Sequence, residues 1–99
     1  MYSQIQILEF LKTQKPFLMS MYQVSKLGVF GSYAKETQVT GSDLDILLEF
    51  EEGTGNLLEK RLSLEDFFQS KLGLKVDIAR ERFLRRGVRD KILRHAIFV

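Results

Sequence analysis

The sequence predicts an α/β (α+β) protein in which helices pack on a small mixed β-sheet. Short apolar segments near residues 27–30, 43–50 and 75–79 have the character of strands, and longer segments with apolar residues at helical spacing lie between them. The chain has 99 residues, and a chain of this length can bury roughly 60–70% of its unfolded surface. We therefore expect a single domain over residues 1–99.

The first 22 residues are predicted to form two short helices. Ser3 and Gln6 have the spacing of a capping box, and apolar residues follow at helical intervals. Lys15 precedes Pro16, and a residue before proline avoids the helical conformation. Proline is well tolerated in the first turn of a helix, so we expect a break at Lys15 and a second helix through Tyr22.

The stretch from residue 27 to residue 50 has the most informative pattern. A buried strand over 27–30 is followed by a Gly31-Ser32 turn, and ten residues separate Ser32 from Asp43, where the next strand opens. Side chains two apart on a strand point to the same side. Asp43 and Asp45 therefore project together, away from the apolar side chains of their strand.

Two neighbouring carboxylates repel each other, and a divalent cation is the usual way to offset that repulsion. Mg²⁺ commonly takes one or two protein carboxylates and completes its shell with water and phosphate oxygens. If a short helix starts at Ser32, its free N–H groups point towards an anion, and Gly31 lets a phosphate approach the backbone. This pattern predicts a site for a nucleoside triphosphate with its metal.

A helix and a third strand are expected next. Asn56 with Glu59 fits a second capping box, and Gly73 is a natural stop for the helix that follows. The strand over residues 75–79 places Asp77 opposite its apolar neighbours. A carboxylate in an apolar strand requires a partner. A neighbouring Lys or Arg is one possibility, and the metal site is the one we favour.

The C-terminal segment is basic. Residues 80–94 contain seven Lys or Arg against Glu81 and Asp90. Such a segment fits nucleotide phosphates, RNA or an acidic protein partner, and equally a solvated helix face. His95 is the only histidine, and we expect it to be structural or exposed. Residues 97–99 are expected to form a short edge strand.

The amino-acid composition indicates the class of protein and the cellular compartment that we expect. Hydrophobic residues make up 44% of the chain and charged residues 28%, which is typical of a soluble globular protein. The chain contains no cysteine, no bilayer-length apolar run and no signal-peptide pattern at its start. We therefore expect a cytoplasmic protein without a membrane segment.

The spacing Gly31-Ser32, ten residues, Asp43-Leu44-Asp45 resembles the signature of the nucleotidyltransferase superfamily that includes DNA polymerase beta. The segments GSYAKE, SDLDILLEF, LGLKVDIARE and RDKILRHAIFV resemble its minimal nucleotidyltransferases (MNT), the antitoxins of HEPN/MNT toxin–antitoxin systems. The likeness extends over nearly the whole chain. It implies a nucleotidyltransferase fold.

The resemblance also implies roles for the acidic residues. Asp43, Asp45 and Asp77 would be the metal ligands and catalytic residues for Mg²⁺, with Asp77 also taking the proton from the attacking hydroxyl. Gly31 and Ser32 would hold the triphosphate.

Two further residues are candidates for nucleotide binding. Lys35 could neutralise phosphate charge. Ser42 could contact the nucleotide, although capping of the preceding turn is the role we favour. Related proteins often place a glycine after the basic residue, whereas Glu36 stands there in this chain, which bears on the geometry of the loop.

The implied function is metal-dependent protein adenylylation. The enzyme would transfer AMP from ATP to a tyrosine of a cognate HEPN ribonuclease toxin, neutralise it, and form a hetero-oligomer with it. A protein partner is favoured over nucleic acid. Two alternatives remain: an antitoxin that acts by binding alone, and a transferase that acts on RNA or a small molecule.

Overall fold

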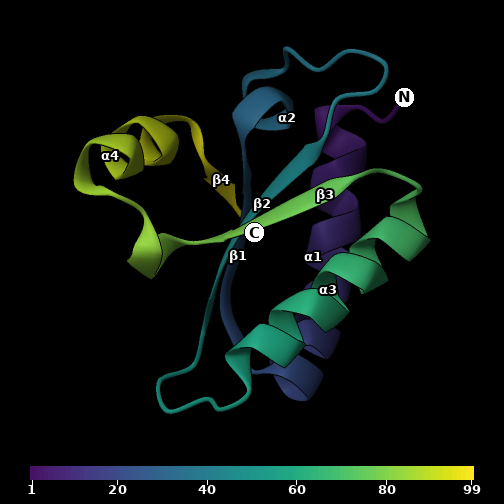
Figure 1. Ribbon diagram of the computed structural model, residues 1–99. Coiled ribbons are helices and arrows are strands. Elements are labelled where there is room, and N and C mark those ends of the chain that lie inside the picture. Colours follow the sequence, from purple (N-terminus) through teal and green to yellow (C-terminus); the bar gives the residue numbers. More distant parts are fainter.

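The computed structural model describes all residues from Met1 to Val99. Its centre is a four-stranded mixed sheet in the order β3-β2-β1-β4 (Figure 1). β1 is antiparallel to both β2 and β4, whereas β2 and β3 are parallel. This confirms the predicted fold class. The strands are β1 (Val24–Phe30), β2 (Leu44–Phe50), β3 (Val76–Arg80) and β4 (Ile97–Phe98).

Two long helices cover one face of the sheet, and a shorter helix lies on the other side (Figure 1). The long helices are α1 (Gln4–Tyr22) and α3 (Leu57–Leu72), and the shorter one is α4 (Arg86–His95). The one-turn helix α2 (Gly31–Lys35) follows β1, and the 3-10 turn η1 (Glu81–Phe83) follows β3. No helix is long and apolar enough to span a membrane.

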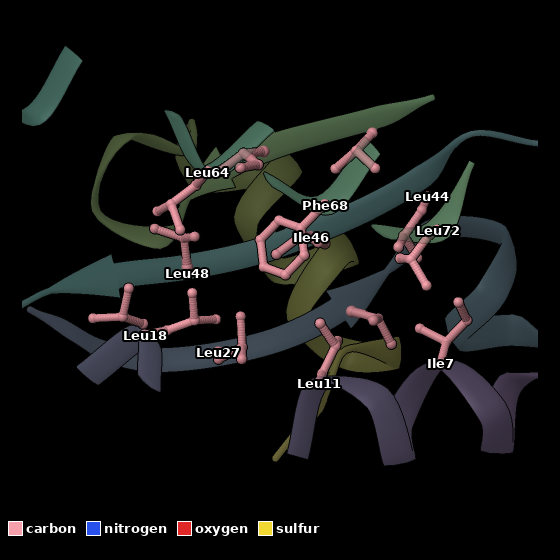
Figure 2. Close-up of a cluster of buried hydrophobic side chains, with 14 of the residues drawn as sticks. Ile7, Leu11, Leu18, Leu27, Leu44, Ile46, Leu48, Leu64, Phe68 and Leu72 are labelled. Carbon is pink, nitrogen blue, oxygen red and sulfur yellow. The ribbon is translucent and has the colours of Figure 1, made fainter. Parts of the chain in front are cut away.

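The core lies between the long helices and the sheet, where apolar side chains from both layers meet (Figure 2). α1 contributes one row of fully buried residues and α3 another, and both point at alternate residues of β2 and at β1. The alternation predicted for β2 is therefore confirmed. The labelled members are Ile7, Leu11, Leu18, Leu27, Leu44, Ile46, Leu48, Leu64, Phe68 and Leu72.

The predicted break before Pro16 is wrong, because α1 is one continuous helix of 19 residues. The capping box at its start is confirmed: Gln6 N donates to Ser3 Oγ at 3.1 Å, and Ser3 N donates to Gln6 Oε1 at 2.9 Å. A proline inside a helix costs about 3 kcal/mol. Leu11 and Leu18 stand on either side of Pro16 and are both fully buried, which continues the core contact past the proline and offsets that cost.

The start of α3 also differs from expectation. Asn56 precedes the helix but has a left-handed backbone with φ 55°, and its side chain makes no capping hydrogen bond, so the second capping box is wrong. A capping residue normally has an extended backbone, which directs its side chain at the free N–H groups. The predicted stop is confirmed, since Gly73 has φ 66° and its N–H donates to Gln69 O at 2.9 Å.

The short edge strand is confirmed as β4, which pairs with β1 opposite Gly28. A Cβ at Gly28 would lie 2.6 Å from the Ile97 carbonyl oxygen and 2.9 Å from Phe98 Cδ1. The absence of a side chain at Gly28 is therefore what lets β4 close onto the sheet.

Candidate active site

The three aspartates come from adjacent strands at one end of the sheet. Asp43 directly precedes β2, Asp45 lies within it, and Asp77 lies in β3. In the parallel β2–β3 pair, Asp45 and Asp77 are register partners, so their side chains lie next to each other on the same face. Their apolar neighbours Val76 and Ile78 are buried on the opposite face. The structure thus brings together residues that are 32 positions apart in the sequence (77 minus 45).

The Gly-Ser turn lies directly against this acidic cluster. α2 begins at Gly31, one residue earlier than predicted, and Phe30 pairs with Asp45 across β1 and β2. Gly31 has φ +69°, and a Cβ there would collide with Asp45 Oδ2. Two independent constraints therefore require glycine at this position: the left-handed backbone and the space that the Asp45 carboxylate occupies.

No ion pair within the protein involves the carboxylates of the cluster: none of the four includes Asp43, Asp45 or Asp77. Partial burial raises the pKa of Asp45, and the charges of Asp77 and then Asp43 raise it further. A Lys or Arg partner for Asp77, the alternative to a metal role, is absent. The cluster has the electrostatics of a cation site.

The arrangement fits an open metal site rather than a closed one. No group of three or more His, Cys, Asp or Glu side chains is placed so that it could hold a metal ion without other ligands. Asp77 is exposed, while Asp43 and Asp45 are half-buried. Carboxylate oxygens open to solvent are the donor set that Mg²⁺ shares with water and phosphate oxygens, so these residues fit the ion that the sequence implies.

The other predicted site residues fall around the Gly-Ser turn. Ser32 lies in the first turn of α2, and its hydroxyl has no hydrogen-bond partner within the protein, whereas its carbonyl accepts from Thr37 N at 2.9 Å. Lys35 ends α2, is exposed and forms no ion pair. Ser42 Oγ accepts from Val39 N at 2.9 Å, which is the turn-capping role favoured above.

Glu36 retains the backbone geometry that a glycine would provide. It has φ 57° and ψ 35°, and its N–H donates back to the Tyr33 carbonyl at 3.4 Å. A left-handed conformation costs a residue with a Cβ about 1–2 kcal/mol. The loop is therefore formed without glycine, at some cost in stability.

Replacement of this residue tests that cost. We expect Glu36→Gly to raise the free energy of unfolding by about 0.5 kcal/mol, because relief of the left-handed strain exceeds the added entropy of the unfolded chain. Urea unfolding measures the change. Glu52→Gly is the matched control, since Glu52 is exposed and has no positive φ, and it should lose stability. Equal losses in both variants would contradict the assignment of strain.

The sequence analysis missed a buried polar network at the other end of the same strands. Glu49 is only 7% exposed, and its Oε2 accepts from Arg80 Nη2 at 2.7 Å and from Arg80 Nε at 3.2 Å. Glu49 Oε1 accepts from Arg82 N at 3.1 Å. Glu81 pairs with Lys26 at 3.0 Å and with Arg89 at 3.7 Å. The signal was available, because Glu49 has the same strand phase as Asp45.

This network lowers the pKa of Glu49. It also connects η1 and α4 to the sheet. Burial alone would raise the pKa of Glu49, but hydrogen bonds from Arg80, Arg82 N and Phe50 N outweigh it and lower that pKa. The ion pair of Arg89 with Glu81 ties α4 to η1. Arg89 is thus already engaged within the protein.

The parallel pairing of two acidic strands, with a glycine turn packed against one carboxylate, is the arrangement expected of a nucleotidyltransferase. A family model described as "Nucleotidyltransferase domain" matches residues 6–99. The chain belongs to this family, and within it to the minimal nucleotidyltransferases that its relatives represent.

The relatives span nearly the whole chain. The protein adenylyltransferase MntA of Thermococcus cleftensis is 36% identical over 89 residues, covering 90% of this chain and 88% of that protein. A solved structure assigned to the minimal nucleotidyltransferases is 31% identical, with a TM-score of 0.79 over 97% of this chain and 95% of that one. A toxin–antitoxin structure with AMP-PNP has a TM-score of 0.67 over 98% of this chain and 72% of that one; at 21% identity it shows the fold alone.

Proposed function

We propose that this protein is a cytoplasmic, Mg²⁺-dependent protein adenylyltransferase that acts as an antitoxin. It transfers AMP from ATP to a tyrosine hydroxyl of a cognate HEPN ribonuclease toxin and so neutralises it. The observation that supports this most directly is the register pairing of Asp45 with Asp77 beside Gly31. The 36% identity to a protein adenylyltransferase supports the reaction class.

The site residues divide into metal ligands and residues that bind the triphosphate. Asp43 and Asp45 would hold Mg²⁺, and Asp77 would complete the ligand set on the side of the nucleophile. When bound, the ion would neutralise the triphosphate and polarise the α-phosphate. Gly31 and Ser32 would bind the triphosphate, with backbone N–H groups and the free Ser32 hydroxyl as donors.

The transfer breaks a phosphoanhydride bond and forms a phosphate ester bond. The acceptor oxygen attacks the α-phosphorus while the bond from that phosphorus to the bridging oxygen of the β-phosphate breaks, and pyrophosphate leaves. The hydroxyl proton passes to the Asp77 carboxylate, which is exposed and able to reach solvent. Catalysis then depends on alignment and on charge stabilisation.

A protein acceptor is favoured because the site is incomplete in the isolated chain. The space beside the Gly-Ser turn measures about 110 Å³. Sites that enclose a nucleotide-sized ligand usually measure about 300–1,000 Å³. A partner that covers the acidic end of the sheet would both enclose the nucleotide and present the hydroxyl.

Transfer of a label tests the proposal. The protein is incubated with Mg²⁺ and ATP labelled at the α-phosphate, with and without the toxin encoded beside it. We expect label on a tyrosine of the toxin and release of unlabelled pyrophosphate. No label anywhere would support neutralisation by binding alone, and label on RNA or a small molecule would support the remaining alternative.

The metal assignment has its own control. Asp43→Ala should remove the signal, because it removes a ligand while leaving the core untouched. If the label still appears on the toxin in this variant, the assignment of Asp43 to the metal is wrong.

A further inference from the structure

One face of α4 lines the space beside the Gly-Ser turn. Lys91 and His95 lie one helical turn apart and therefore on the same side of α4. The cavity of about 110 Å³ is bounded by both residues and by residues of β1 and α2: Phe30, Gly31, Lys35, Lys91, Ile92 and His95. Three of its six lining residues are Lys or His, and none is acidic.

The basic side chains around this cavity have no partner within the protein. Lys35, Lys91 and His95 take part in none of the four ion pairs. By contrast, Arg80 and Arg89 of the same C-terminal segment are paired with Glu49 and Glu81. Within the C-terminal segment, Arg80 and Arg89 therefore form ion pairs inside the protein, whereas Lys91 and His95 form none.

The cavity that Lys91 and His95 line lies beside the acidic cluster. Gly31 lines the cavity and is also the residue whose missing side chain leaves room for the Asp45 carboxylate. A cationic cavity and an anionic cluster therefore meet at one glycine. A ligand that satisfies both is an anion of several linked phosphates that also carries a divalent cation.

We infer that Lys91 and His95 of α4, together with Lys35, bind the β- and γ-phosphates of the nucleotide and the pyrophosphate that leaves. This inference rests on the proposed function, since it assigns additional residues to the same site. Lys91 contributes a fixed positive charge, and His95 contributes a ring N–H donor. α4 is then a binding element for the triphosphate and not only a solvated helix.

Binding measurements on the intact protein test the assignment without the toxin. Calorimetry gives the affinities of wild type, Lys91→Gln and His95→Asn for Mg²⁺–ATP, Mg²⁺–tripolyphosphate and AMP. We expect Lys91→Gln to weaken binding of the first two about tenfold and His95→Asn about threefold. AMP lacks the β- and γ-phosphates, so its affinity should change less than about twofold.

Arg94→Gln is the matched control, because it removes one charge from the same helix at an exposed position outside the cavity. Its affinities should stay within about twofold of wild type. If Lys91→Gln behaves like Arg94→Gln, or weakens AMP as much as ATP, the inference is overturned while the proposed function stands. If Lys91→Gln selectively weakens tripolyphosphate but no AMP reaches the toxin, the inference stands and the proposed function fails.

Discussion

Asp45→Asn is expected to lower AMP transfer to the toxin by roughly a thousandfold and, at the same time, to make the protein more stable by about 1 kcal/mol. Activity falls because a carboxylamide oxygen carries no charge with which to hold Mg²⁺. Stability rises because the Asp45 carboxylate is partly buried beside Asp77 and Asp43 with no basic partner, which is why its pKa is raised. The substitution removes that repulsion and keeps the shape of the side chain.

Labelled-AMP transfer and urea unfolding measure the two effects on one preparation. Asp66→Asn is the matched control, since Asp66 is exposed on α3 and forms no ion pair. It should leave both quantities unchanged. A loss of stability in Asp45→Asn would show that the Asp45 carboxylate makes net stabilising interactions. That result would contradict the repulsion on which this prediction rests.

Glu49→Gln has the largest expected effect on folding: a loss of about 3 kcal/mol in the free energy of unfolding. The Arg80 and Glu49 side chains are 11% and 9% exposed, and their closest N–O distance is 2.7 Å. Removal of the carboxylate charge leaves the Arg80 guanidinium with little access to water. It also weakens the hydrogen bond that Arg82 N donates to Glu49. Arg82 lies in η1, which precedes α4 in the chain.

The exposed pair of Arg61 with Glu65 provides the control. Their side chains are 46% and 24% exposed, so Glu65→Gln should cost no more than about 0.5 kcal/mol. Chemical unfolding of both variants separates a buried ion pair from an exposed one. Similar losses would show that burial does not set the contribution of Glu49.

Acid should reproduce part of the Glu49→Gln effect. The pKa of Glu49 is lowered in the folded protein, so its contribution to stability is fully present above its unfolded pKa of about 4.3. That contribution is lost as the pH falls through the lower, folded pKa. Below about pH 4 wild type should therefore lose stability more steeply than Glu49→Gln, and parallel curves would contradict this assignment.

The predictable parts of the sheet are those that follow from the alternation of apolar and polar residues along a single strand. Asp45 and Asp77 were found from the sequence because each stands out of phase with apolar neighbours on its own strand. The same alternation predicted the buried side of β2. What it could not give is which strands are neighbours, and the pairing of β2 with β3 is what makes Asp45 and Asp77 adjacent.

The wrong predictions have a common physical cause, which is that long-range packing overrode a local preference. Pro16 should interrupt a helix by its own chemistry, but burial of Leu18 on the sheet keeps α1 continuous. Asn56 has capping chemistry, yet the route of the chain from β2 into α3 holds it in a left-handed turn. No role was predicted for Glu49, because its partner Arg80 lies on β3, 31 residues further along the chain.

The adjacency of Asp45 and Asp77 has a consequence for biosynthesis. The two residues belong to strands that become neighbours only after the crossover through α3 has closed, which is a slow, non-local step in folding. A nascent chain that has emerged only as far as α3 contains the Gly-Ser turn and the first two aspartates but lacks the third. The three-aspartate cluster therefore forms only after β3 has been synthesised and has docked beside β2, and a chain that ends before β3 cannot assemble it.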